Sequence, residues 1–313
     1  MHAGLGKLGY QREPQWEDLR MKQRLRNATG KSRTALVIFA VFTQAVALVA
    51  RAGSAQADTL ISICGYAIQA AGKYRLATDL GPCSGDGIDI RTGNVTLDLD
   101  GYTITGPANG NGAGIDVEVG GSRAKGINIK GPGRIQKFSY GIFLSNTDNA
   151  QVQDVLLEIN SDYGIYVNGS VNVQLQDNVF THNGSYGLLL LNSGGSQVYD
   201  NYISGNGNSG TSDAGGLDIA GGTGSQVSGN IVDSNQPFGI VLFNAGQQQV
   251  EGNKIYGNYS TGFRIESAST GNVVRDNAAE GNLIYDLEDD NSGCDTNNWQ
   301  NNVFFTSNQT CIR

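Results

Sequence analysis

The chain has 313 residues, of which 39% are hydrophobic and 16% are charged, so it can bury a sizeable core and is not wholly disordered. Its 45 glycines and 5 prolines lack the triplet period of collagen and indicate many tight turns between short strands. The formal net charge is −8 at neutral pH, and it becomes more acidic when the N-terminal segment is set aside.

Residues 1–57 have the composition of a cleaved signal peptide. Basic residues precede an apolar run over 35–50, and Ala-Gln-Ala at 55–57 is a small-x-small cleavage site. A membrane anchor is the alternative, but a run of about 16 residues that contains Gln44 is short for a hydrocarbon core of about 30 Å. Met21 opens a conventional signal sequence, and we expect it to be the true start.

Cleavage after residue 57 leaves 12 basic and 26 acidic residues, a net charge of −14. Such a surface repels DNA, RNA and anionic lipid, so nucleic-acid binding is excluded. We expect a protein without a membrane span after cleavage, located in the periplasm, outside the cell or at the cell surface.

All four cysteines follow the leader, two near the start of the mature chain and two near its end. Four cysteines allow three pairings, and export to an oxidising compartment favours disulfides. A soft-metal site is the alternative, but residues 58–313 contain no Met and only His182. We predict no cofactor and two sequence-local disulfides, Cys64–Cys83 and Cys294–Cys311.

A glycine followed by an apolar-x-apolar triplet recurs through the chain. The spacings are 27, 27, 23, 23, 29, 23 and 23 residues. Each period contains three short runs of alternating apolar residues, and such a unit buries its apolar face only by stacking on its neighbours. The repeat glycines are Gly87, Gly114, Gly141, Gly164, Gly187, Gly216, Gly239 and Gly262.

This repeat predicts an all-β fold, a single-stranded right-handed parallel β-helix of about nine coils with disulfide-bonded caps. We place the N-terminal cap at residues 58–85, the β-helix at 86–307 and the C-terminal cap tail at 308–313. Each disulfide closes a loop of nearly twenty residues and should contribute about 3 kcal/mol.

Two asparagine columns share the register of the glycines. Amides stacked in this way hydrogen-bond along the helix axis. Asp154, Asp177 and Asp200 stand just before the first column, where a calcium ladder is one interpretation. Because that position continues as Gly229 and Gly252, a left-handed turn is favoured. The first column is Asn178, Asn201, Asn230, Asn253, Asn277 and Asn302, and the second is Asn160, Asn183, Asn206, Asn235, Asn258 and Asn282.

The coil pattern resembles the pectin-lyase-like superfamily of right-handed β-helices, and is most similar to exported right-handed parallel β-helix repeat proteins. The segment 95–106, Val-Thr-Leu-Asp-Leu-Asp-Gly-Tyr-Thr-Ile-Thr-Gly, resembles the entry coil of that group. The resemblance implies that a substrate groove lies along the first strand of each coil. The repeat is also similar to periplasmic copper-processing β-helix proteins, but the mature chain lacks Met and nearly lacks His.

The outward side of these first strands is apolar and aromatic at its centre, and we call it the first-strand face. Its rings could stack on sugars, or its apolar residues could be covered by a loop, a cap or a second subunit. We predict ligand-binding roles for Phe143, Tyr166, Asp218, Phe243 and Arg264.

Asp89 and Asp116 are the candidate catalytic residues, because stacking would place their carboxylates about 5 Å apart, as in retaining glycosidases. Repulsion in such a pair should raise one pKa, although Arg91 on the same face could simply neutralise Asp89. The familiar sets are mostly missing: Asn-Thr-Asp at 146–148 lacks its partners, and no Lys or Arg lies between Phe138 and Asn253. Outside this face, the pattern predicts an ion pair between Lys130 and Asp100.

Two functions follow. The favoured one is an exported protein that binds a polysaccharide or a surface protein without a recognisable catalytic set, and that could form oligomers through the first-strand face. The alternative is a polysaccharide lyase, hydrolase or epimerase with an atypical site, for which calcium is possible but unsupported.

Overall fold

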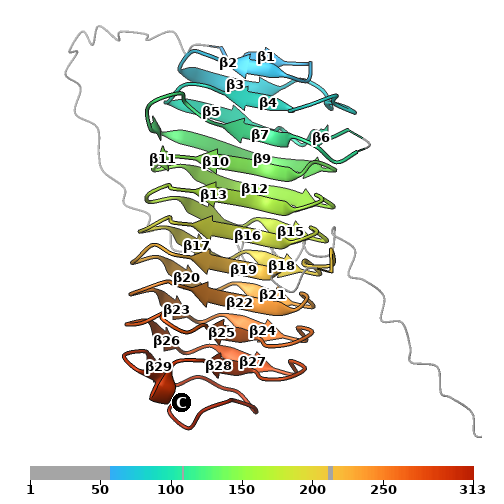
Figure 1. Ribbon diagram of the computed structural model, residues 1–313. Coiled ribbons are helices and arrows are strands. Elements are labelled where there is room, and N and C mark those ends of the chain that lie inside the picture. Colours follow the sequence, from blue (N-terminus) through green and yellow to red (C-terminus); the bar gives the residue numbers. More distant parts are fainter. Residues whose placement is uncertain (1–56, 108, 211–213) are drawn as a thin grey trace, which may run out of the picture. The chain divides into compact units, whose positions relative to one another are not determined.

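Parallel strands stack coil upon coil in the computed structural model, which describes residues 57–107, 109–210 and 214–313 (Figure 1). The first strand of each coil belongs to a ten-stranded sheet in which neighbours pair in parallel. Its members are β2 (Tyr66–Ile68), β4 (Ile88–Ile90), β7 (Ala113–Val117), β10 (Tyr140–Ser145), β13 (Tyr163–Asn168), β16 (Tyr186–Leu191), β19 (Gly215–Ala220), β22 (Phe238–Phe243), β25 (Phe263–Ile265) and β28 (Leu287–Asp289).

The second and third strands of the coils form a 17-stranded sheet. Two parallel stacks join in it because β9 and β12 are long enough to run through both. Its members are β1 (Thr59–Ile61), β3 (Gly72–Leu76), β5 (Val95–Asp98), β6 (Thr103–Thr105), β9 (Ile127–Gln136), β12 (Gln151–Glu158), β14 (Gln174–Gln176), β15 (Val179–Thr181), β17 (Gln197–Tyr199), β18 (Tyr202–Ser204), β20 (Gln226–Ser228), β21 (Ile231–Asp233), β23 (Gln249–Glu251), β24 (Lys254–Tyr256), β26 (Val273–Arg275), β27 (Ala278–Glu280) and β29 (Asn298–Gln300).

The remaining elements are small. Strands β8 (Ala124–Lys125) and β11 (Thr147–Asp148) pair with each other, and a short 3-10 turn, η1, spans Ser292–Cys294. No helix in the described part of the chain is long and apolar enough to cross a membrane.

The core is a set of aliphatic columns inside the coils. Strand geometry sends alternate side chains inward, and stacking at about 4.8 Å brings equivalent side chains into contact. In the ten-stranded sheet, Ile142 pairs with Ile165, and Leu188 with Leu217, and all four are fully buried. The repeat therefore buries one continuous core, as predicted.

Both asparagine columns are buried amide ladders, which confirms the predicted register. Asn183 Nδ2 donates to Asn206 Oδ1 at 2.9 Å, and Asn206 Nδ2 donates to Asn235 Oδ1 at 2.9 Å. In the other column, Asn178 Nδ2 donates to Asn201 Oδ1 at 3.2 Å. The same pattern continues along the first column through Asn201, Asn230, Asn253, Asn277 and Asn302.

The position before the first ladder has a left-handed backbone, as the turn interpretation predicted. Asp154, Asp177 and Asp200 have φ values of 59°, 54° and 55°. Glycines 229 and 252 follow in the column with φ values of 65° and 64°. Gly and Asp recur here because they tolerate this conformation.

Each end of the stack carries one disulfide, with the predicted pairing. Cα atoms are 5.5 Å apart for Cys64–Cys83 and 6.1 Å apart for Cys294–Cys311. The ten-stranded sheet has one strand more than the nine coils expected, because β2 adds a coil before the first repeat glycine. The domain boundaries stay predictions, and the predicted signal peptide, apart from Ala57, lies outside the described residues.

Candidate functional site

Six of the seven predicted site residues share one outward column of the ten-stranded sheet. Asp89 pairs with Asp116, Asp116 with Phe143, and Phe143 with Tyr166. The column continues through Leu189, Asp218, Val241 and Arg264. Phe243, the seventh, ends β22 in the column two residues further along and is 44% exposed.

Aromatic rings gather at the centre of this face, and we call the five of them the aromatic cluster. Tyr163 lies 5.2 Å from Tyr166 between ring centroids, and Phe143 lies 5.3 Å from Tyr166. Tyr140 stacks on Tyr163 at 5.6 Å with parallel planes. The cluster consists of Tyr140, Phe143, Tyr163, Tyr166 and Tyr186.

Three of these tyrosines were missed in the sequence. Tyr140, Tyr163 and Tyr186 pair with one another in register, in the column three residues before the predicted one. Each directly precedes a repeat glycine at 23-residue spacing. A tyrosine before each of these glycines was the signal that could have revealed the column. It falls just outside the repeat pattern, which begins at the glycine.

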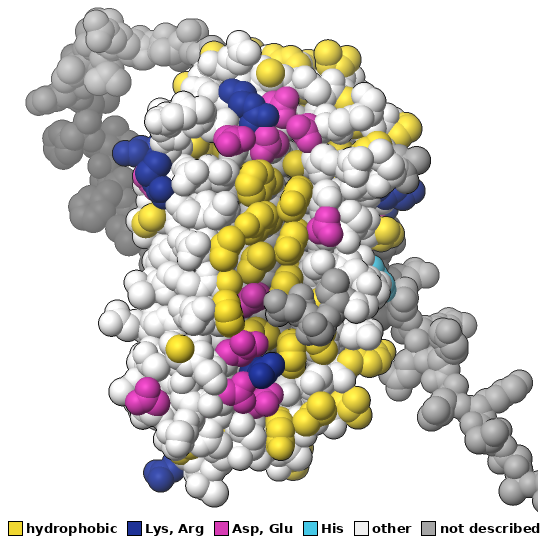
Figure 2. Space-filling view, in the orientation of Figure 1, with side chains coloured by type: hydrophobic (Ala, Val, Ile, Leu, Met, Phe, Trp, Pro, Cys, Tyr) yellow, Lys and Arg dark blue, Asp and Glu magenta, His cyan; other side chains and the backbone are white. Residues whose placement is uncertain are grey.

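The aromatic cluster continues into an aliphatic part, and together they form the apolar band seen in Figure 2. Leu189 and Val241 are 8% and 3% exposed, whereas the Phe143 and Tyr166 side chains are half-buried. Asp218 lies between Leu189 and Val241 in the column and is 6% exposed. The aromatic rings of the band are therefore more accessible to a ligand than its aliphatic side chains.

At one end of the band, several carboxylates surround one guanidinium group. Arg91 Nη2 lies 3.0 Å from Asp89 Oδ1 and 2.6 Å from Asp116 Oδ2. Asp86 joins them, since one oxygen from each of the three carboxylates lies within 4.8 Å of the others. Burial raises the pKa of both Asp89 and Asp116, although the Arg91 charge opposes the rise. The predicted juxtaposition is present, and its catalytic role stays a prediction.

The opposite end of the band repeats this arrangement around Arg264. Its Nη2 lies 2.7 Å from Asp290 Oδ2, and its Nε lies 3.7 Å from Glu288 Oε2. Glu266 Oε1 lies 3.5 Å from Nη1, and the guanidinium carbon lies 5.2 Å from the centre of the Phe238 ring. Figure 2 shows charged side chains at both ends of the band.

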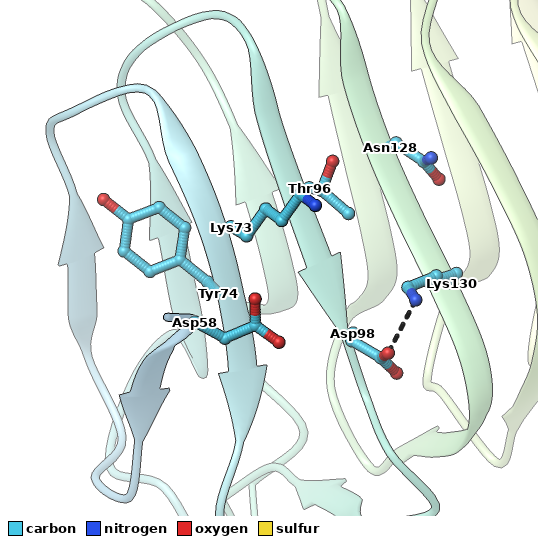
Figure 3. A pocket seen from close by; sticks show the side chains of 7 residues that line it. All are labelled: Asp58, Lys73, Tyr74, Thr96, Asp98, Asn128 and Lys130. Atoms are coloured by element: carbon cyan, nitrogen blue, oxygen red, sulfur yellow. Dashed lines mark ion pairs between the residues drawn. The ribbon is translucent and has the colours of Figure 1, made fainter. Parts of the chain in front are cut away.

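A hollow on the 17-stranded sheet lies outside this face (Figure 3). It is lined in part by Lys73, Thr96 and Asn128, which stand in one column of β3, β5 and β9. Lys130 Nζ pairs here with Asp98 Oδ2 at 2.7 Å. The predicted partner Asp100 was wrong, because β9 pairs with β5 two residues away from the expected register.

A family model described as "Periplasmic copper-binding protein (NosD)" matches residues 81–309. The chain belongs to the NosD family. No protein with a curated function has significant sequence similarity to this NosD-family chain.

Solved structures share the fold at low sequence identity. The Dettilon tailspike protein is 13% identical over 78% of this chain and 52% of its own, with a TM-score of 0.58. The enzymatically active domain of bacteriophage CBA120 tailspike protein 2 is 16% identical over 75% and 38%, with a TM-score of 0.55. The periplasmic alginate epimerase AlgG is 15% identical over 70% and 60%, with a TM-score of 0.49. The chain thus spans 60% or less of each, and the two tailspike likenesses show the fold alone.

The family description implies copper, and the described residues offer few ligands for it. All four cysteines are in disulfides, and the described residues contain no Met. The His182 side chain is exposed, with its Nδ1 2.6 Å from Thr181 Oγ1. Copper favours thiolate, thioether and imidazole ligands. These residues therefore do not fit a copper site.

Proposed function

We propose that this NosD-family chain is an exported carbohydrate-binding protein, periplasmic or extracellular, that holds a polysaccharide along its first-strand face without turning it over. The aromatic cluster carries the proposal. Four of its five rings are half-buried and aligned along the coil axis, and they present apolar surface on which the C–H faces of sugar rings stack.

The geometry of the stack supports an extended ligand rather than a small one. Successive coils repeat at about 4.8 Å, close to the length of one hexose unit in an extended chain. Phe143 and Tyr166 lie one coil apart, and Arg264 lies six coils from Asp116 along the same column. A linear polymer lying along the axis would meet equivalent positions coil after coil.

Export is supported by the disulfides at both ends, since such bonds persist in oxidising compartments. Binding without turnover is favoured over catalysis by Arg91, which pairs with both candidate carboxylates. A general acid or a nucleophile at this position would first have to release the guanidinium.

The test is binding of the exported, processed protein to a glycan array, followed by titration with the best ligand. Phe143→Leu and Tyr166→Leu remove flat rings while keeping the column apolar, since Leu189 already occupies its next position. We expect roughly tenfold weaker binding for each variant. Tyr256→Leu, on β24 of the other sheet and 40% exposed, is the matched control.

Three outcomes would count against the proposal. Retention of no glycan would remove it, and equal losses in Tyr256→Leu would show that the effect is not local to the face. Reducing ends or unsaturated products that vanish in Asp116→Asn would favour the enzyme instead. Light scattering on the same samples measures whether copies of the chain associate.

A further inference from the structure

Negative charge lies at both ends of the first-strand face and inside it. Asp218 stands within the apolar band, one coil from Leu189 on one side and Val241 on the other. Further acidic residues lie in the two charged groups already described: Asp86, Asp89 and Asp116 at one end, and Glu266, Glu288 and Asp290 at the other.

The cations of this face are already engaged by these carboxylates. Arg91 binds Asp89 and Asp116, and Arg264 binds Asp290 through both Nε and Nη2, at 3.0 and 2.7 Å. No Lys or Arg occurs in the sequence between residues 138 and 253, which form the central coils. Among the residues that the structure describes, a ligand carboxylate would find no uncommitted cation along the band.

We infer that the face selects polysaccharides that carry no acidic groups, with hydroxyl or ammonium donors, and rejects polyuronates. This inference rests on the proposed carbohydrate-binding function. The carboxylates of the face can accept hydrogen bonds from hydroxyl and ammonium groups of a ligand. A uronate carboxylate offers no hydrogen-bond donor, and its negative charge is repelled by the carboxylates of the face. Each pair of like charges about 5 Å apart weakens binding about fourfold even at the dielectric constant of water.

The directions of the pKa shifts agree with this selection. Burial raises the pKa of Asp89 and Asp116, so their environment already disfavours negative charge. Burial, with the neighbouring tyrosines and acids, raises the pKa of Tyr163 to about 12. The phenol therefore stays neutral and keeps its donor at physiological pH.

The experiment compares oligomers that differ only in charge. Hexamers of β-1,4-linked glucose, of glucosamine and of glucuronate share one backbone, and equivalent manno and galacto series extend the set. We expect the neutral or amine-bearing member to bind at least tenfold more tightly than its uronate counterpart at an ionic strength of about 0.01 M. The difference should shrink at about 1 M, where the Debye length falls to about 3 Å.

Charge-removing variants test whether the face itself makes the selection. Asp218→Asn should strengthen uronate binding about fourfold and so narrow the preference for neutral or amine-bearing oligomers over uronates. Asp89→Asn should act in the same direction. Glu280→Gln removes the same charge from β27 on the other sheet and should leave the preference unchanged. Circular dichroism checks that each variant is folded.

The outcomes separate this inference from the proposal on which it rests. Uronates bound as tightly as their neutral counterparts, or an unchanged preference in both aspartate variants, would overturn the charge selection and leave carbohydrate binding standing. Binding of no member of any series would remove both. Preference for the amine over the neutral member would identify which donor the carboxylates accept.

Discussion

Asp116 lies beside Asp89 in the parallel pairing of β7 with β4, and the two carboxylates share one guanidinium. Burial raises the pKa of each carboxyl group, and Arg91 limits the rise. The pair is thus held as part of a charged group with Asp86 rather than as two carboxylates alone. The contribution of this charged group to the free energy of unfolding should depend on the Arg91 guanidinium and on pH.

Arg91→Gln should lower the free energy of unfolding by about 2 kcal/mol at neutral pH, because it leaves two partly buried carboxylates without their shared cation. Removing the cation raises both native pKa values further. A carboxyl group with a raised native pKa stabilises the fold fully below its unfolded pKa, near the ordinary 3.8, and loses that contribution as pH rises through the native value. The defect should therefore be largest at neutral pH and disappear near pH 3.8.

Urea unfolding at several pH values measures this effect. Arg275→Gln is the matched control, because Arg275 pairs with Glu251 on the exposed surface of the other sheet. Arg275→Gln should lower the free energy of unfolding by less than about 0.5 kcal/mol at every pH. A pH-independent loss in Arg91→Gln would show that the side chain acts through packing and not through its charge.

Asn206→Ala should be among the most damaging substitutions of a single polar residue. Asn206 is fully buried, accepts from Asn183 Nδ2 at 2.9 Å, and donates to Asn235 Oδ1 and to the Phe180 carbonyl oxygen. Truncation leaves buried donors and acceptors without partners, so we expect a loss of about 3 kcal/mol. Gln249→Ala removes an exposed amide from β23 and should cost less than about 0.5 kcal/mol. Similar losses in the two variants would contradict a structural role for the ladder.

The columns were predictable where the period is regular. From Gly141 to Gly187 and from Gly216 to Gly262 the spacing is 23 residues, so aligning like positions placed Phe143, Tyr166 and Arg264 in one column. The Asn and Gly positions are fixed by backbone geometry and by buried amides, which few other residues satisfy.

Register failed where the spacing is irregular. The sequence aligned Leu99 with Ile129, whereas the structure pairs Leu97 with Ile129. A shift of two residues keeps every inward side chain inward, because the strand period is two. The apolar pattern could not detect this shift, so Lys130 was assigned to Asp100 instead of Asp98. Which residues of the apolar band are buried depends on neighbouring coils and loops, and the pattern carries no information on them.

Removing the C-terminal disulfide with Cys294→Ala and Cys311→Ala together should lower the free energy of unfolding by about 3 kcal/mol, because the bond closes a loop with a sequence separation of 17 residues. Trp299 is the only Trp after residue 57, and it packs against Phe263 near this end. Its fluorescence should therefore report loosening of the C-terminal coil in this variant. The N-terminal pair Cys64→Ala and Cys83→Ala should lower the free energy of unfolding similarly, but Trp299 fluorescence should not change before the whole protein unfolds. If Trp299 fluorescence changed equally early in both variants, each disulfide would not be stabilising only its own end of the stack.

Asp286 closes the second asparagine ladder and should make the C-terminal end sensitive to acid. Its Oδ1 accepts from Asn282 Nδ2 at 3.0 Å, and its Oδ2 accepts from the backbone N–H groups of Phe305 and Thr306, both at 3.0 Å. Burial alone would raise its pKa, but these hydrogen bonds outweigh burial and lower it below the ordinary value of 3.8. A lowered native pKa stabilises the fold above the unfolded value and loses that contribution as pH falls through the native value.

Asp286→Asn should therefore cost about 2 kcal/mol at neutral pH, since one oxygen that accepts two backbone hydrogen bonds is replaced by a donor. The difference from the unmodified protein should narrow below pH 3.8, where the natural carboxyl group also begins to take up a proton. Trp299 fluorescence and urea unfolding across this range measure both effects. Asp295→Asn changes an exposed acid in the same region and should leave stability within about 0.5 kcal/mol. If Asp286→Asn remained equally destabilised at all pH values, the ionised carboxylate would not be the group that holds this end together.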